Sequence, residues 1–135
     1  SLGIDLGAGD ALDVVATHFH SGGDDSALRI TQSLEVLRQV DRNRSTVLLG
    51  DLNAHPDHPE MLLMVGSGLT DTFIASGETG DGFTARSNDP WERIDYIWAT
   101  ADLKARNFTV SQSLASDHFA VSVTLHKPAA TALTR

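Results

Sequence analysis

Cysteine is absent from the 135 residues of this chain. A disulfide scaffold and a thiolate metal site are therefore excluded, although the absence does not identify a compartment. Apolar runs are also short, far below the roughly 18–20 residues that a membrane-spanning helix needs. The first residues have neither the basic start nor the apolar run of a signal peptide.

Basic residues are scarce: 10 Lys and Arg stand against 18 Asp and Glu, which gives a formal net charge of -8. This balance argues against a broad nucleic-acid surface, because phosphate binding requires clustered Lys and Arg. An excess of acid also arises where carboxylates gather to hold a metal. Hydrophobic content of 41% and charged content of 21% indicate a globular chain. The length predicts one domain or a piece of a larger one.

The pattern of apolar residues predicts an α/β chain. Alternating Leu2, Ile4 and Leu6, a turn over 7–10 and a β-rich segment over 12–19 indicate a hairpin that leads into a buried strand. Further along we expect a helix over 24–42, a short helix over 59–65, a long loop over 66–90, and strands over 46–49, 93–98, 105–110 and 119–125. This order favours a layered α/β domain over residues 1–126, with a frayed tail over 127–135.

The expected helix over 24–42 has a predicted buried face, formed by apolar residues at three- and four-residue spacing: Ala27, Ile30, Leu34 and Leu37. Arg29 falls on another face, so we expect it to face water. Asp24, Asp25 and Ser26 are candidates for the N-cap, because a side-chain oxygen there accepts a bond from a free backbone N–H.

Four polar clusters follow or begin predicted strands: Thr17-His18-Phe19-His20, Gly50-Asp51-Leu52-Asn53, Arg93-Ile94-Asp95-Tyr96 and Ser116-Asp117-His118. Imidazoles, carboxylates and an amide at strand ends suit the hydrolysis of a phosphate ester. A divalent cation needs oxygen ligands. The attacking water needs a base, the leaving oxygen needs an acid, and the developing charge needs hydrogen-bond donors.

Spacing within the clusters leaves alternatives open. Asp51 and Asn53 are two positions apart, so in an extended segment they point to the same side and could share one metal or one phosphate. The same pattern is equally typical of turn chemistry, in which both side chains bond nearby backbone. Asp117 and His118 are adjacent, and only a turn between them would bring both to one site.

Taken together, the motifs Thr17-His18, Gly50-Asp51-Leu52-Asn53-Ala54, Arg93-Ile94-Asp95-Tyr96-Ile97 and Ser116-Asp117-His118 resemble those of a known family. The chain is similar to the C-terminal half of the endonuclease/exonuclease/phosphatase (deoxyribonuclease-like) superfamily. The resemblance covers roughly residues 11–125, and weaker support comes from Phe83-Thr84. Its members include deoxyribonucleases, abasic-site endonucleases, sphingomyelinases and inositol polyphosphate phosphatases.

This resemblance implies a four-layer α/β/β/α sandwich and a phosphodiesterase, phosphatase or nuclease that depends on Mg²⁺ or Mn²⁺. It implies that His18 contacts the scissile phosphate. Asp51 would orient or deprotonate the attacking water, and Asn53 would hold the same water or the phosphate.

For the remaining motif residues, the resemblance implies that Asp95 fixes the tautomer of His118, which binds and stabilises the phosphate. A carboxylate behind an imidazole is also chemically sensible by itself, since it orients the ring and raises its basicity. The implied metal ligands are Asp51, Asn53 and Asp117. The implied substrate-binding residues are His18, Asn53 and His118.

The chain departs from the family in what it lacks. The N-terminal half of such proteins contributes an Asn and a Glu, the Glu being the main metal ligand, and neither motif occurs in this sequence. We therefore expect a fragment with an underfilled metal site and an exposed apolar sheet face. The expected partner is an N-terminal half or a second copy. The competing interpretation is a catalytically inactive regulatory or assembly module.

Other histidines leave two further interpretations. His18 and His20 loosely resemble the His-x-His motif of metallo-β-lactamase-like hydrolases, but the Asp-His that should follow is absent. His55 and His58 near Asp57 form a second possible metal cluster, although solvated loop histidines are the commoner case. The loop over 66–90 is more acidic than basic, which favours a small phosphodiester, lipid headgroup or sugar phosphate over long nucleic acid.

Overall fold

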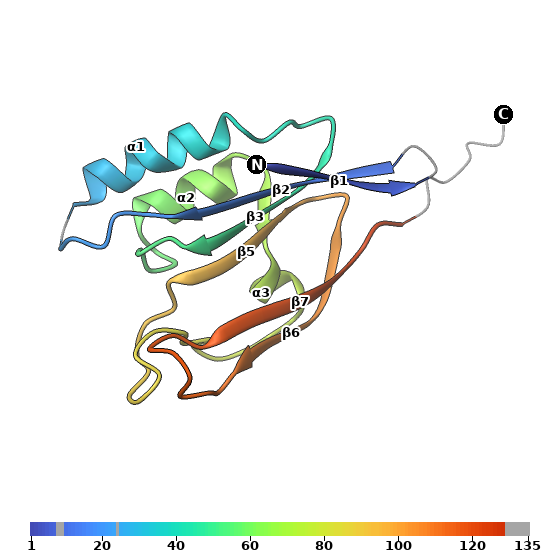
Figure 1. Ribbon diagram of the computed structural model, residues 1–135. Helices are drawn as coiled ribbons and strands as arrows, with labels where there is room; N and C mark the ends of the chain where they lie inside the picture. Colours follow the sequence, from blue (N-terminus) through green and yellow to red (C-terminus); the bar gives the residue numbers. More distant parts are fainter. Residues whose placement is uncertain (8–9, 24, 129–135) are drawn as a thin grey trace, which may run out of the picture.

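The computed structural model describes residues 1–7, 10–23 and 25–128, and it folds them into seven strands and three helices (Figure 1). In chain order the elements are β1 (Leu2–Gly7), β2 (Asp10–His18), α1 (Ser26–Leu37), β3 (Ser45–Asp51), α2 (Pro59–Gly66), β4 (Leu69–Asp71), α3 (Thr72–Ala75), β5 (Asp95–Thr100), β6 (Lys104–Ser111) and β7 (Ala120–His126).

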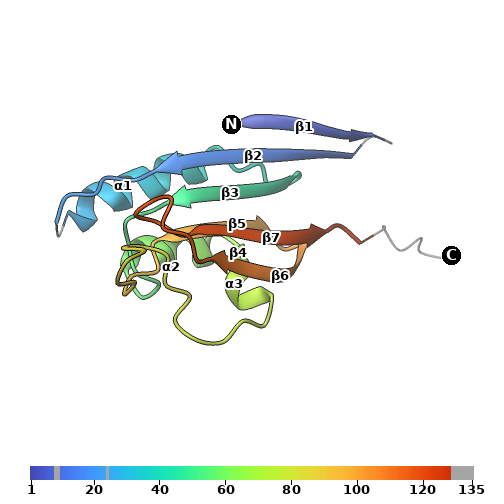
Figure 2. The same ribbon diagram turned by 60° about the horizontal axis from the view of Figure 1, so that its bottom comes forward.

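Two sheets form the centre of the fold. The first has the strand order β1-β2-β3-β5-β4, and the second consists of β6 and β7 (Figure 2). β2 and β3 run parallel, so α1 serves as the crossover between them, whereas the other pairs are antiparallel. The carboxyl ends of β2 and β3 therefore lie next to the start of β5, at the same end of the sheet.

Each face of the larger sheet has its own core. On one face Leu48 and Trp98 of the sheet pack with Met61 and Met64 of α2, together with apolar residues at the end of α1. On the other face a smaller cluster around Val47 includes Leu125 of β7. The described residues thus give a helix layer, a five-stranded sheet and a two-stranded sheet, which confirms the expected α/β class.

The prediction of one long loop over 66–90 was wrong in part. β4 pairs with β5 through Leu69, Thr70 and Asp71, and α3 follows it at once. The Thr72 hydroxyl donates a hydrogen bond to the Ile97 carbonyl at 2.7 Å. A three-residue strand is too short to show an alternating pattern, so these elements depend on contacts with β5 that local sequence does not encode.

The expected orientation of α1 was wrong in part, since Leu37 packs against the core as expected but two other residues do not lie as predicted. Arg29 does not face water but is 4% exposed, whereas Leu34, expected in the core, is 46% exposed. The reason is an ion pair between the helices: Arg29 Nε donates to Glu60 Oε1 of α2 at 2.9 Å. This pair lies inside the helix layer and turns the apolar stripe of α1 partly outward.

Asp25 caps α1, since its side chain accepts from the Leu28 N–H. Asp24, residues 8–9 of the expected turn and residues 129–135 of the expected frayed tail lie outside the described residues. Within the described part of the chain, no helix has the length and apolar character needed to cross a bilayer.

Candidate active site

Three of the expected site residues form one row across the sheet. His18 ends β2, Asp51 ends β3, and Asp95 begins β5, and the strand register pairs His18 with Asp51 and Asp51 with Asp95. Residues paired in register project on the same face of a sheet. The row therefore places an imidazole and two carboxylates side by side, on the face opposite α1 and α2.

His118 completes this row from the other sheet, just before β7. Its Nδ1 lies 2.8 Å from Asp95 Oδ2 and 4.0 Å from Asp51 Oδ2. His18 Nε2 lies 3.5 Å from Asp51 Oδ2 on the exposed side. The expected contact between Asp95 and His118 is thus present. Since the carboxylate accepts, Nδ1 of His118 carries a proton in this contact.

Gly50 allows β3 to approach β2 directly before Asp51. Its φ is +142°, and a Cβ atom at this position would lie 1.8 Å from the Thr17 carbonyl oxygen. No other residue fits there without moving the backbone. The Phe19 N–H then donates to the Asp51 carbonyl at 2.9 Å, so the two strand ends are held together.

Asn53 shows that the turn chemistry of the Asp-x-Asn pattern is real. Its backbone N–H donates to Asp51 Oδ1 at 2.9 Å, and its side-chain Nδ2 donates to the Phe19 carbonyl at 2.9 Å. Asn53 also has a φ of +47°, a conformation that Asn tolerates better than most residues. Asn53 therefore fixes the Asp51 side chain and ties it to the end of β2.

Thr84 is a positioning residue whose role the sequence did not reveal. Its side-chain Oγ1 accepts from the N–H groups of Ile94 at 3.3 Å and Asp95 at 3.2 Å. Its carbonyl accepts from the Phe119 N–H at 2.7 Å. Through these bonds one buried residue holds the backbone of Asp95 beside that of His118. The sequence marked Phe83-Thr84 only as weak support for the family resemblance, and no local pattern links Thr84 to Asp95.

Tyr96 connects two of the motifs. Its hydroxyl lies within hydrogen-bond distance of two carbonyls, that of Ala54 at 2.7 Å and that of Arg93 at 2.8 Å. The ring is buried and stacks on Trp98 at a centroid distance of 5.8 Å. Burial raises the pKa of the Tyr96 hydroxyl far above its usual value, so the group stays a donor. The turn after Asp51 is thereby anchored to the strand that carries Asp95.

Burial and neighbouring charges shift protons within the cluster. Burial raises the pKa of Asp51, and the Asn53 N–H, which lowers it, does not cancel the effect; the nearby Asp95 charge raises it further. Burial lowers the pKa of His118, but its hydrogen bond to Asp95 and the surrounding carboxylates outweigh this, so that pKa lies above its usual value. The Asp51 shift is thus mainly an effect of burial, whereas the His118 shift reflects the surrounding carboxylates, whose negative charge a bound cation would offset.

The donor set is compatible with a divalent metal. Ligand atoms of Asp51, Asp95 and His118 lie within 4.8 Å of one another, and among the described residues they form the only such group. Carboxylate oxygens suit Mg²⁺ and Mn²⁺.

The two alternative histidine sites receive no support from the described residues. His20 lies 3.9 Å from Asp25 and belongs to no metal-binding group with His18, and His55 with His58 belongs to no such group either.

Asp117 is not part of this group of three. It is exposed in a bend directly before His118, and its carbonyl accepts from the Ser87 N–H at 2.8 Å. The bend is the turn that would be needed for both residues to serve one site. Asp117 and His118 both border a cavity of about 730 Å³ next to the cluster.

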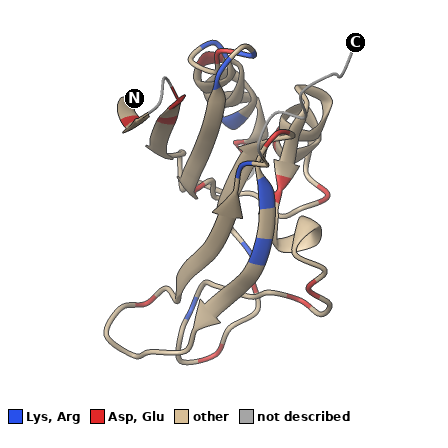
Figure 3. Cartoon of the chain, turned by 90° about the vertical axis from the view of Figure 1, so that its right-hand side faces the viewer, with Lys and Arg blue, Asp and Glu red and all other residues tan. Residues whose placement is uncertain are grey.

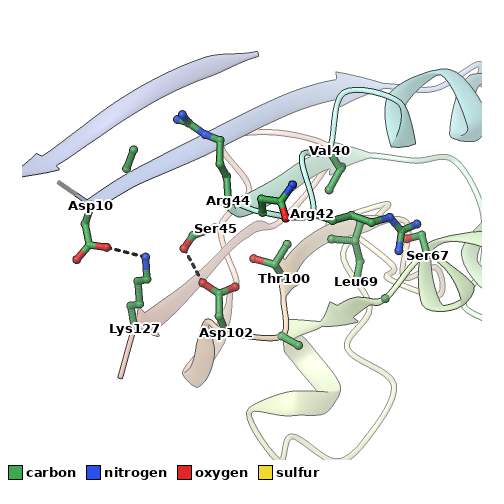
Figure 4. Close-up of a pocket in the computed structure, with 14 residues that line it drawn as sticks. Asp10, Val40, Arg42, Arg44, Ser45, Ser67, Leu69, Thr100, Asp102 and Lys127 are labelled. Atoms are coloured by element: carbon green, nitrogen blue, oxygen red, sulfur yellow. Dashed lines mark hydrogen bonds and ion pairs between the residues drawn. The ribbon is translucent and has the colours of Figure 1, made fainter. Parts of the chain in front are cut away.

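A second cavity, of about 690 Å³, lies at the opposite end of the sheet (Figure 4). Its charged side chains are largely paired within the structure. Lys127 Nζ donates to Asp10 Oδ1 at 2.7 Å, and the Ser45 hydroxyl donates to Asp102 Oδ2. No expected site residue lines it. The chemistry is therefore concentrated at the other end.

The protein is a two-sheet α/β domain whose carboxylates and imidazoles gather at the strand ends. Such an arrangement is typical of enzymes that work by acid–base catalysis. The model of the Endonuclease/Exonuclease/phosphatase family matches residues 2–118. The chain therefore belongs to this family, whose members are hydrolases of phosphate esters. No curated protein matches the chain.

Solved structures share the fold. A conserved protein of unknown function from Enterococcus faecalis V583 has a TM-score of 0.75 at 21% identity, covering 91% of this chain and 53% of its own. The mannosyl-6-phosphatase Bt3783 of Bacteroides thetaiotaomicron VPI-5482 has a TM-score of 0.74 at 21% identity, with 88% and 52% covered. Truncated Caenorhabditis elegans TDP2 has a TM-score of 0.65 at 21% identity, with 87% and 55% covered. The chain thus spans about half the length of these proteins.

Proposed function

We propose that this chain carries the acid–base half of a phosphate-ester hydrolase that uses a divalent metal. The observation that supports this most directly is the row of His18, Asp51 and Asp95, closed by His118 at 2.8 Å from Asp95. Family membership supplies the reaction class. Phosphate-ester hydrolysis is also the activity named for one of the structural neighbours, a mannosyl-6-phosphatase.

Each residue has a role that follows from its position. Asp51 accepts a proton from the attacking water, since its carboxylate is held by Asn53 and lies beside His18 and His118 on the sheet face opposite α1 and α2. His118, oriented by Asp95, and the exposed His18 bind phosphate oxygens and stabilise the charge that develops on them. Asn53 keeps the water and phosphate in place through its fixed turn.

Asp51 and Asp117, with Asn53, would hold the metal, and Asp95 adds a carboxylate within reach. The bound ion would supply charge neutralisation for the phosphate. These side chains fill few coordination positions, so we propose that an N-terminal half contributes further ligands. The chain spans about half the length of its structural neighbours, which is consistent with this arrangement.

The test is hydrolysis of a chromogenic phosphomonoester and phosphodiester with Mg²⁺ or Mn²⁺, for the chain alone and for the chain mixed with a separately produced N-terminal half. We expect activity that requires the metal and rises strongly when both halves are present. If both halves bind each other and the metal but cleave neither substrate, the competing assembly-module function is the correct one.

A further inference from the structure

The cavity beside the cluster, hereafter the side cavity, is lined mainly by polar and charged residues. Its lining includes Arg29, His55, Arg86, Glu92, Asp117 and His118. Asn53, in the turn after β3, and His118, which closes the row, border it, so whatever is attached to a phosphate at the cluster has this space next to it. Its volume of about 730 Å³ falls within the range of roughly 300–1,000 Å³ typical of small-molecule sites.

Apart from its histidines, His55, His58 and His118, the side cavity has balanced charge. Its two guanidinium groups, Arg29 and Arg86, are matched by the carboxylates of Glu92 and Asp117. The charge of Arg29 is moreover already neutralised within the protein. Its Nε donates to the fully buried Glu60 at 2.9 Å, and its Nη1 donates to the Gly23 carbonyl at 3.3 Å. A second phosphate would need an excess of positive charge, which this lining does not provide.

The side cavity also lacks surfaces for apolar ligands. Among the described residues, Ala85 and Ile94 are the only apolar side chains in its lining, and both are buried. The nearby Trp91 is not part of the lining; its ring lies 5.6 Å from the Arg86 guanidinium carbon and 6.0 Å from the His55 ring. The aromatic rings in this lining are those of His55, His58 and His118, which offer a nucleobase less stacking surface than a Trp or Tyr ring, and an acyl chain would have no apolar wall.

We propose that the side cavity binds the alcohol part of the substrate, and that this part is a neutral, hydroxyl-rich group such as a sugar. This rests on the proposed function, in which the cluster binds the phosphate. Hydroxyl groups both donate and accept hydrogen bonds. Glu92 and Asp117 accept from them, while the exposed Arg86 donates to them, so the mixed lining suits a sugar phosphate better than a nucleotide or a phospholipid.

Binding of metal-free protein separates this inference from catalysis. We would follow amide and histidine NMR resonances of the full chain in EDTA, with glucose 6-phosphate, AMP, phosphocholine and inorganic phosphate as probes. Glucose 6-phosphate is expected to bind about tenfold more tightly than AMP or phosphocholine, and to shift His55 and His58, because several hydroxyl contacts add to the phosphate contact.

Glu92→Gln tests the wall itself. The change keeps the shape of the side chain and removes one charged acceptor, so we expect about a tenfold loss of affinity for glucose 6-phosphate and no change for inorganic phosphate. Glu78→Gln, on the exposed loop outside the side cavity, is the matched control and should change neither. If Glu92→Gln alters the amide spectrum of the fold, His55→Gln replaces it.

Equal affinities for glucose 6-phosphate, AMP and phosphocholine, no detectable sugar phosphate binding, or equal losses for both glutamine variants would overturn the inference. Failure of the proposed function has a different signature. If the protein prefers the sugar phosphate but hydrolyses nothing with any metal, the side cavity assignment stands and the proposed catalytic role is wrong. If it hydrolyses phosphate esters but binds the three probes equally, the catalytic role stands and the side cavity assignment is wrong.

Discussion

At the scale of single residues, Asp51 is the side chain on which the proposed chemistry depends. It stands at the centre of the row, between His18 and Asp95 and within 4.0 Å of His118. Its raised pKa shows that the fold tolerates the neutral form of this group better than the unfolded chain does. Function and stability therefore make opposite demands at this position.

Asp51→Asn is expected to lower hydrolysis by the reconstituted protein by roughly 10²–10⁴-fold, the usual contribution of a general base. The free energy of unfolding should stay equal or rise slightly, because a charge that the folded state disfavours is removed. Steady-state kinetics and urea denaturation measure the two effects. Asp57→Asn, on the exposed part of the same loop, is the control, and equal activity of the two variants would contradict the assigned role.

Thr84→Val tests positioning. The substitution keeps the side-chain shape but leaves the Ile94 and Asp95 N–H groups without their acceptor, so we expect a loss of about 1–3 kcal/mol in unfolding free energy. The histidine NMR signals of His118 should shift even in variants that remain folded, because Asp95 moves relative to it. Thr79→Val, on the exposed part of the same long loop, should do neither.

At the scale of elements, the helix layer is joined by a buried ion pair. Arg29 and Glu60 come from α1 and α2, with side-chain exposures of 5% and 0%. Burial raises the pKa of Glu60, but its own backbone N–H, the Ser26 hydroxyl and the Arg29 guanidinium outweigh burial and leave that pKa below its usual value. The ionised carboxylate is thus bound more strongly in the folded state than in the unfolded one.

This linkage predicts a pH dependence of stability. Because the folded pKa of Glu60 is lowered, its contribution is fully present above the usual glutamate value of 4.5 and is lost as the pH falls below that value and through the folded pKa. In Glu60→Gln the slope of unfolding free energy against pH should decrease in this acid range only. Urea denaturation between pH 3 and pH 7 measures it, and an unchanged slope would exclude the pair as its source.

Removing the arginine of the same ion pair should lower the free energy of unfolding strongly. Arg29→Met leaves a buried carboxylate unpaired and is expected to lose about 3–5 kcal/mol, whereas the double variant Arg29→Met with Glu60→Met should recover much of this. Arg38→Met is the control, since the pair of Arg38 with Glu35 is exposed on the same helix and contributes at most about 1 kcal/mol. Similar losses for the two single arginine variants would contradict this view of the helix layer.

The sequence predicted those elements whose signals are local. Alternation and turn residues located most strands, and the polar motifs at their ends included Asp51 and Asp95, which the structure brings into one row. The orientation of α1 was not predictable, because the Arg29–Glu60 contact joins residues 31 positions apart. Nor was the role of Thr84, which acts on Asp95 from 11 positions away through a loop without periodicity. Such long-range polar contacts have no local pattern.

At the scale of the whole molecule, charge is spread along the chain rather than gathered in a basic stripe (Figure 3). With a net charge of -8, the surface is poorly suited to long nucleic acid.

The sheet face that carries the row of His18, Asp51 and Asp95 also has exposed apolar side chains. Leu2 is 64% exposed and Ile4 is 38% exposed, and register places both on the face that includes Val14 and His18. This apolar face continues directly into the site.

We therefore expect the chain to associate through that face, either with an N-terminal half or with a second copy. Replacing Leu2 and Ile4 by Thr should weaken binding of the N-terminal half and reduce self-association, with little loss in thermal stability because both side chains are already exposed. Sedimentation velocity and titration of the two halves measure this. Monomeric wild-type protein that binds no N-terminal half would exclude this proposal.

One consequence of the strand register concerns when the site forms. Because His18, Asp51 and Asp95 are the last rung of a ladder of backbone hydrogen bonds, their spacing is fixed when the sheet folds and not when a ligand arrives. A slip of one residue in β3 would turn the Asp51 side chain to the helix face. Backbone amides around Gly50 should therefore exchange with solvent as slowly as those of the core, and the entropy of ordering these groups is lost during folding rather than at each turnover.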